Sequence, residues 1–262
     1  MAVAQCGTYK GDISLEPSVT GNVSLDGLET IGDSTHGGSL NIITDLQISS
    51  ISSDSLTTIA GWLHLANSSI TTLSFPQLSS VGVFLDIVDV PALTELQLAY
   101  GLTAGSRTAS YGFTNPTANI SNTGLTELIG LLDGTNFDIT ITHNTNLHTV
   151  SLLSKQIIMQ TLSDGSNVDG SGNLLIGNNS ASTSVDLPNL FSTAGAMTVG
   201  DCAGLNIPLL ALVNGSMELP NATFSSLSAP ALERINGDLT LTGAFSKYGA
   251  RPSRLADVAN QI

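Results

Sequence analysis

Charged side chains are scarce in this sequence, and basic ones are the scarcest. Only 11% of the 262 residues are charged, against about 25% in an average globular chain. Seven Lys and Arg against 21 Asp and Glu give a formal net charge of −14. Because nucleic acids and anionic lipid surfaces are bound chiefly by clustered Lys and Arg, this balance argues against both as partners.

Aromatic residues, cysteines and long apolar runs are also few. The aromatic content is 5%, there are two cysteines, and the longest apolar runs, of about 10 residues, fall short of the ~20 of a transmembrane helix. The opening "MAVAQC" lacks the hydrophobic region of a signal peptide. The whole sequence is 41% hydrophobic, and about a quarter of it is serine and threonine. This composition predicts a folded protein with a neutral, hydroxyl-rich surface.

A repeat of 20 to 23 residues runs through most of the chain. A glycine and one further residue precede a triplet of the form apolar-x-apolar. This pattern occurs at Gly38, Gly61, Gly172, Gly195, Gly215 and Gly237, and at Gly82 with one more residue inserted before the triplet. A phrase with an apolar residue, proline and leucine recurs in "FPQLSSVG" (75–82), "LPNLFSTAG" (187–195) and "APALERING" (229–237). One short strand per 20–29 residues is the signature of a leucine-rich or β-solenoid repeat.

These observations predict a mainly β protein with little helix. We expect a right-handed parallel β-solenoid, of the type of leucine-rich repeats and receptor L domains, with about ten coils stacked at the ~4.8 Å strand spacing. The corner glycines would supply positive φ, and apolar pairs such as those in "ITTLSFP" (70–76) would form a second short strand. Leu125 to Leu132 is the only stretch with a pattern compatible with a short helix.

We expect residues 1–243 to form a single solenoid domain. Long insertions near 99–113 and 154–168 would project from one side, and the tail 244–262, which leaves the repeat, would be a cap, disordered, or an artefact of how the coding sequence was assembled. Cys6 and Cys202 would lie too far apart along the stack for a disulfide, although an oxidising compartment would permit one.

The repeat resembles that of the fungal GPI-anchored cell-wall organisation proteins, whose fold is similar to receptor L domains. The phrases "ITTLSFPQLSSVG", "SVDLPNLFSTAG" and "FSSLSAPALERINGDLTLTG" carry the resemblance, which covers roughly residues 6–243. It implies a monomeric, non-enzymatic, N-glycosylated protein of the cell surface or wall that contributes to wall organisation and integrity. It also implies a signal peptide and a GPI-attachment signal; this sequence shows neither, so we expect an ectodomain alone or a truncated form.

Six asparagines begin N-x-S/T triplets and are candidate N-glycosylation sites, although so many hydroxyl residues would produce four or five such triplets by chance. They are Asn22, Asn67, Asn119, Asn178, Asn214 and Asn221.

No catalytic, cofactor-binding or metal site is predicted. Several aspartates lie at or beside strands, where stacking could bring two carboxylates together as in a glycosidase; they are Asp86, Asp89, Asp138, Asp186, Asp201 and Asp238. The basic residues that hold an acidic polysaccharide are nearly absent from the coils. The four histidines are scattered, and "DGSNVDGSGN" (164–173) lacks the spacing of a calcium loop.

Tyr100, Tyr111 and Phe113 bracket the first insertion and form a candidate binding loop, although packing against the scaffold would equally explain them. The preferred hypothesis is a wall protein that presents its hydroxyl-rich surface to wall polysaccharide or to another wall protein. A receptor-like ligand-binding ectodomain and a β-helix polysaccharide-active enzyme are the alternatives.

Overall fold

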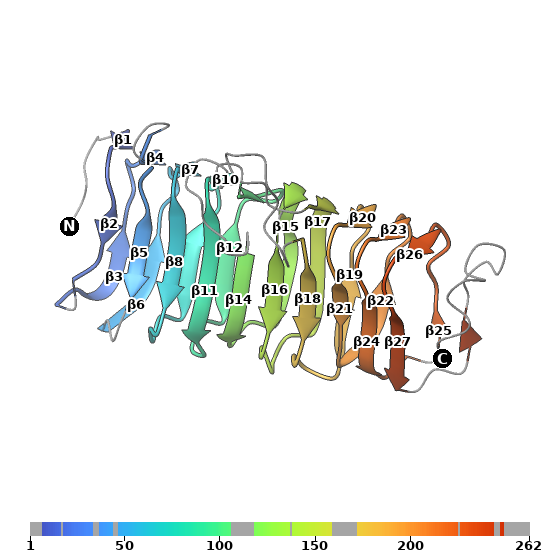
Figure 1. The fold of residues 1–262 in the computed structure, drawn as a ribbon. Coiled ribbons are helices and arrows are strands. Elements are labelled where there is room, and N and C mark those ends of the chain that lie inside the picture. Colours follow the sequence, from blue (N-terminus) through green and yellow to red (C-terminus); the bar gives the residue numbers. More distant parts are fainter. Residues whose placement is uncertain are drawn as a thin grey trace.

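The chain folds into an elongated stack of short parallel strands (Figure 1). The computed structural model describes residues 7–16, 18–33, 37–43, 47–105, 118–136, 138–158, 172–224, 226–243 and 247–248. All regular structure in these ranges is β-strand, and every pair of named strands is parallel. Strands β1 (Thr8–Tyr9) and β2 (Ile13–Ser14) lie at one end of the stack, and β27 (Leu239–Gly243) lies near the other. The predicted β-solenoid is confirmed.

One continuous sheet runs the length of the stack, with one strand from each coil. Its order is β2, β5 (Leu40–Ile43), β8 (Trp62–Ala66), β11 (Phe84–Val90), β14 (Ala118–Thr123), β16 (Ile139–Thr142), β18 (Leu174–Gly177), β21 (Met197–Val199), β24 (Met217–Ala222) and β27. These strands contain the apolar-x-apolar triplets of the sequence, so the repeat and the sheet coincide.

The second face of the coils consists of two sheets rather than one. The first contains β3 (Thr20–Ser24), β6 (Gln47–Ser52), β9 (Thr72–Phe75) and β12 (Glu95–Leu98). The second contains β15 (Glu127–Asn136), β17 (Thr149–Ile157), β19 (Thr183–Asp186) and β22 (Cys202–Asn206). No pairing joins β12 to β15 among the strands that the structure describes.

Two-residue strands form the third face, where the chain turns toward the next coil. They are β1, β4 (Thr30–Ile31), β7 (Thr58–Ile59), β10 (Ser80–Val81) and β13 (Thr103–Ala104), then β20 (Ser192–Thr193), β23 (Leu212–Val213) and β26 (Arg234–Ile235). A small separate sheet pairs β25 (Ser226–Leu227) with β28 (Lys247–Tyr248).

The interior is filled by aliphatic side chains that stack from coil to coil. In the long sheet the first triplet positions of adjacent coils, such as Leu40, Leu63 and Leu85, are in register and fully buried. A single coil could not cover these side chains, whereas its two neighbours remove nearly all of their surface from water. Stability therefore depends on the stacking of coils.

The predicted short helix near Leu125 to Leu132 is wrong, because this stretch forms the start of the bulged strand β15. Register shifts against β17 occur after Ile129 and Leu131, and Gly130 and Leu132 have positive φ. Each bulge adds a residue, so the buried side chains are spaced as in a helix; they are Leu125, Leu128, Leu131 and Leu132. The spacing of the buried leucines in this bulged strand therefore resembles the period of a helix.

The role predicted for the corner glycines also needs correction. Gly38 and Gly172 adopt positive φ, at 137° and 82°, as predicted, but Gly61 and Gly215 do not. A Cβ added to Gly61 would lie 2.6 Å from Ser39 Oγ and 2.8 Å from the Gly38 carbonyl oxygen of the preceding coil. Glycine is needed at such corners because adjacent coils pass too closely to leave room for a side chain.

Left-handed backbone at non-glycine residues also occurs at or just after the end of seven long-sheet strands, from β8 to β24. The φ angles at these corners lie between 49° and 61°, and the residues are Asn67, Asp89, Asn122, His143, Asn178, Asp201 and Asn221. Asn, Asp and His are the non-glycine residues most often found in this conformation, because of their short polar side chains. The sequence carries this pattern visibly, and it would have located every one of these corners.

Asn144, which follows His143, is a fully buried link between coils. Its Oδ1 accepts hydrogen bonds from the Thr123 backbone N–H at 3.0 Å and from Thr123 Oγ1 at 2.7 Å. Its Nδ2 donates to the Ile120 and Thr142 carbonyl oxygens, both at 3.0 Å, and to Asn179 Oδ1 at 3.1 Å. This one amide satisfies the backbone of two coils and contacts a third.

Candidate functional site

The outward side of the long sheet is the most extensive regular surface of the molecule. The middle residue of each triplet points outward because side chains alternate along a strand. Strand register places these middle residues in one row, about 4.8 Å from coil to coil. The row, hereafter the outer row, consists of Ser14, Asn41, His64, Asp86, Asn119, Thr140, Leu175, Thr198, Glu218 and Thr240.

Three consecutive members of the outer row form a hydrogen-bonded chain. His64 Nδ1 lies 2.8 Å from Asp86 Oδ2, and Asn119 Nδ2 donates to Asp86 Oδ1 at 3.1 Å. Asp86 is 8% exposed, so its carboxylate is held between its neighbours. This arrangement uses the Asp86 carboxylate to hold the His64 ring and the Asn119 amide, and these two half-buried side chains remain partly accessible for hydrogen bonding with a polar ligand.

An aromatic pair adjoins this chain at the start of the same strands. Trp62 pairs in register with Phe84, and their rings meet edge to face with centroids 5.4 Å apart and an interplanar angle of 74°. Trp62 is half-buried, whereas Phe84 is buried. Phe84 therefore supports the Trp62 ring from one side, and the aromatic pair stands beside polar groups as it does at many binding surfaces.

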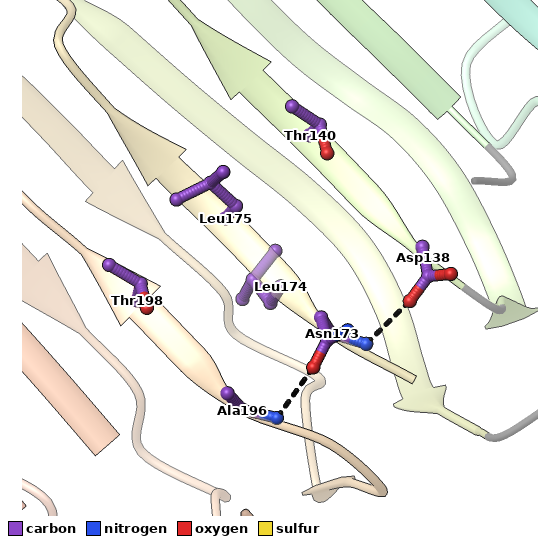
Figure 2. A pocket seen from close by; sticks show the side chains of 7 residues that line it. All are labelled: Asp138, Thr140, Asn173, Leu174, Leu175, Ala196 and Thr198. Carbon is purple, nitrogen blue, oxygen red and sulfur yellow. Dashed lines mark hydrogen bonds between the residues drawn. The ribbon is translucent and has the colours of Figure 1, made fainter. Parts of the chain in front are cut away.

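Further along the sheet the same face is hollowed into a shallow pocket of about 370 Å³ (Figure 2). The pocket is lined by Asp138, Thr140, Asn173, Leu174, Leu175, Ala196 and Thr198. Asp138 Oδ1 accepts the Asn173 backbone N–H at 2.7 Å, and Asn173 Oδ1 accepts the Ala196 backbone N–H at 2.8 Å. These bonds connect three coils through the floor of the pocket.

Burial raises the pKa of Asp138, while hydrogen bonds from the backbone N–H groups of Asn173 and Gly172 oppose the shift. The folded protein therefore retains the proton on this carboxyl to a higher pH than the unfolded chain does. The contribution of Asp138 to stability is consequently largest below the ordinary aspartate pKa and declines as the pH rises through the folded-state value.

We expect Asp138→Asn to raise the free energy of unfolding near neutral pH and to flatten its pH dependence. The new amide removes the buried charge and retains an oxygen for the Asn173 N–H, as Asn173 already does for Ala196. Urea unfolding from pH 4 to 7 measures both effects. Asp238→Asn is the control, because Asp238 is exposed and its replacement reports only the lowering of the net negative charge. Equal changes in the two variants would contradict the prediction.

Of the aspartates considered as an enzymatic pair, all but the exposed Asp238 have a side chain that contacts another coil. At the corners, Asp89 Oδ1 accepts from Asn122 at 2.9 Å and Asp201 Oδ1 accepts from Asn221 at 3.2 Å. On β19, Asp186 Oδ1 accepts from Asn206 at 2.6 Å. Within the described ranges no group of three His, Cys, Asp or Glu side chains could hold a metal ion.

The six candidate glycosylation asparagines lie in different settings. Asn67, Asn178 and Asn221 are exposed at left-handed corners, and Asn22 is exposed on β3. In contrast, Asn119 is half-buried in the outer row and hydrogen-bonded to Asp86.

The sixth, Asn214, is exposed beside Gly215 and accepts a hydrogen bond from Asn236. Exposure makes these asparagines accessible except Asn119, and their glycosylation stays a prediction.

The structure describes the candidate binding loop only as far as residue 105 and, of its three aromatic residues, only Tyr100. Tyr100 is 78% exposed, and its ring lies against Gly130, where an added Cβ would come within 2.3 Å of the ring. Tyr111 and Phe113 lie outside the described residues, as do most of the second insertion and most of the tail. A role for this loop in binding remains a prediction.

Cys202 is free and buried. Burial raises the pKa of its thiol to about 11, so the thiol stays protonated and unreactive at neutral pH. Cys6 lies outside the described residues. In the part of the chain that the structure describes, no helix has the length and apolarity needed to cross a membrane.

Two curated fungal proteins are similar to this chain. "Protein ecm33" of Aspergillus fumigatus is 30% identical over 238 residues, which cover 90% of this chain and 52% of that protein. A "Cell surface GPI-anchored protein" of Arthroderma benhamiae is 28% identical over 249 residues, covering 78% of this chain and 64% of that protein. The chain therefore spans about half to two thirds of the length of these relatives.

No family model matches the sequence, and no solved structure matches the fold. The relatives match along most of the solenoid, and the name of the second agrees with the resemblance carried by the repeat phrases. The chain is therefore similar to two fungal proteins, one of them named as a GPI-anchored cell surface protein.

Proposed function

We propose that this chain is a non-enzymatic protein of the fungal cell surface or wall that presents the outer face of its long sheet to wall polysaccharide. The location follows from the two relatives, one named as a GPI-anchored cell surface protein. By the same relationship, the chain would reach the surface through secretion and would contribute to wall organisation and integrity.

The observation that carries the choice of surface is the outer row beside the Trp62–Phe84 pair. A polysaccharide is a long polymer of hydroxyl groups, and it needs repeated donors and acceptors along an extended, rigid surface. The outer row supplies them on most coils, for example at Asn41, Asn119 and Thr240, and is interrupted by Leu175. The half-buried Trp62 adds an aromatic surface against which the apolar side of a sugar ring can pack.

Binding to insoluble β-glucan, mannan and chitin tests the proposal. We expect the purified chain to sediment with at least one of these polymers, and Trp62→Ala to lower the bound fraction about fivefold or more. Trp62→Phe, which keeps an aromatic ring, is expected to restore much of the binding. Phe191→Ala is the control, since Phe191 is an aromatic side chain, 53% exposed, that precedes β20 on the third face.

Each alternative function has its own outcome in the same experiment. Release of reducing sugar ends would favour a polysaccharide-active enzyme, and tight binding of one soluble protein would favour a receptor-like ectodomain. Unchanged polymer binding by a folded Trp62→Ala protein would reject the outer face as the contact surface.

A further inference from the structure

The second face of the solenoid opens between β12 and β15. Elsewhere on this face adjacent strands pair in register, but almost all Cα–Cα distances between β12 and β15 exceed 8 Å. Paired strands lie about 4.8 Å apart, so β12 and β15 are separated by more than the spacing of paired strands along most of their length. We call this opening the β12–β15 slot.

The coils remain joined on both sides of the slot. Toward the third face, the Gly101 N–H donates to the Gly130 carbonyl oxygen at 2.7 Å and the Asp133 N–H donates to the Leu102 carbonyl oxygen at 3.0 Å. At the opposite corner Asn122 Nδ2 donates to Asp89 Oδ1 at 2.9 Å. The opening is therefore a bounded gap within a continuous stack.

Apolar side chains that belong to the core are exposed in the slot. Leu96 and Leu98 pair in register with Leu73 and Phe75, which are fully buried, yet both leucines are only partly buried. Across the slot Ile129 is 50% exposed. The cavity between the strands has a volume of about 370 Å³ and is lined by Pro76, Leu96, Gln97, Leu98, Glu127, Leu128, Ile129 and Leu131.

Backbone groups on β12 also face the slot. In a parallel strand alternate residues present their N–H and C=O to the same neighbour. The Glu95 N–H donates to Thr71 of the preceding coil, so Leu96 and Leu98 present their groups to the side of β15, where no described strand pairs with them. An unpaired strand edge is a template for the addition of an extended chain.

The charge at the slot is negative. Glu127 lines the cavity, Glu95 begins the opposite strand, and no Lys or Arg is among the lining residues. The whole chain carries a formal charge of −14, which disfavours insertion of a segment from a second copy. A basic segment would be attracted to this region.

We propose that the β12–β15 slot binds an extended segment of a partner polypeptide, apolar at alternate positions and flanked by Lys or Arg. The segment would hydrogen-bond to the open edge of β12, turn its apolar side chains inward against Leu96, Leu98 and Leu128, and place an outward side chain beside Ile129. This site lies on a different face from the outer row, so it does not depend on the proposed polysaccharide contact.

A labelled peptide of sequence Lys-Val-Thr-Val-Thr-Val-Lys tests the proposal by fluorescence anisotropy against the full chain. We expect saturable binding, and about tenfold or more weaker binding of the same peptide with glutamate at both ends. A version with proline in place of both threonines should also bind weakly, because proline cannot donate to the strand edge. Absence of saturable binding by the lysine peptide would overturn the proposal.

Two matched variants locate the bound peptide. Ile129→Asp is expected to weaken binding about tenfold or more, whereas Leu209→Asp should leave it unchanged. Leu209 is 51% exposed, close to the 50% of Ile129, and lies between β22 and β23. Circular dichroism verifies that both variants are folded, and equal effects of the two substitutions would overturn the assignment.

Hydrogen exchange provides a readout that does not depend on affinity. In the free protein the amides of Leu96 and Leu98 should exchange faster than that of Leu73, and the peptide should slow them. Protection of these amides in the free protein would show that the edge is closed. Self-association that Ile129→Asp abolishes would identify a second copy as the occupant and overturn the partner-peptide proposal.

Discussion

Asn144→Ala is expected to cause a large loss of stability, about 3–5 kcal/mol in the free energy of unfolding. Asn144 is fully buried, and its amide bonds to Thr123, Ile120, Thr142 and Asn179. Alanine leaves several of these buried groups without a partner, at about 1–3 kcal/mol each. Urea unfolding followed by far-UV circular dichroism and by the fluorescence of Trp62 measures the change.

Asn206→Ala is the matched control for this prediction. Asn206 is also a hydrogen-bonded asparagine, since its Nδ2 donates to Asp186 Oδ1 at 2.6 Å, but it is exposed on β22. Its loss should cost about 1 kcal/mol or less, because water replaces the lost bond. If Asn144→Ala cost no more than Asn206→Ala, the amide link between coils would not be a determinant of stability.

Gly215→Ala is expected to lower the free energy of unfolding by about 3 kcal/mol. An added Cβ would lie 2.7 Å from Gly195 C and from Ala196 N, both backbone atoms of the preceding coil. These atoms cannot move aside without lengthening the hydrogen bond from the Gly215 N–H to the Gly195 carbonyl oxygen, now 3.1 Å. Overpacking of this kind costs about 1–3 kcal/mol and occasionally more.

Gly177→Ala is the control for this prediction. It separates steric crowding by the neighbouring coil from the general effect of replacing glycine with alanine. Gly177 lies on β18, has an ordinary φ, and an added Cβ would be 3.9 Å from its nearest neighbour, Gly200 N. This substitution should leave stability unchanged or raise it slightly, because alanine restricts the unfolded chain. A similar loss in both variants would mean that coil spacing is not the reason for glycine at position 215.

The repeat unit was predictable from the sequence because recurring glycines mark its period and apolar residues mark the positions that face the interior. The triplets at 40–42, 63–65 and 239–241 all became strands of the long sheet. An aliphatic pair with one residue between it has a single stable arrangement in such a stack, with both side chains facing the interior. Residue chemistry therefore determined the architecture.

Bulges and coil spacing were not predictable in the same way. Gly130 and Leu132 adopt positive φ only as part of β15, and the resulting spacing of buried leucines resembles that of a helix. The corner glycines were correctly located, but positive φ explains only some of them, such as Gly38 and Gly172; Gly61 and Gly215 are required by the distance to the preceding coil, which is a property of the stack. A sequence pattern does not contain that distance.

The candidate surfaces, too, were predictable from the sequence only in part. The outer row follows from the alternation of the triplets, but its hydrogen-bonded chain, His64 to Asp86 to Asn119, joins residues 22 and 33 positions apart, and only the register reveals it. The β12–β15 slot has no signal in the sequence, since Leu96 has the same type of neighbours as the fully buried Leu73.

By itself the sequence determined the solenoid, its strand positions and its hydroxyl-rich, acidic exterior, because these depend on which side chains favour the interior and which favour water. The tertiary structure alone decided where neighbouring coils touch, where they separate and which distant polar groups meet. Those features depend on how coils with different bulges and corner conformations stack, and stacking joins residues that are 20 or more positions apart in the chain.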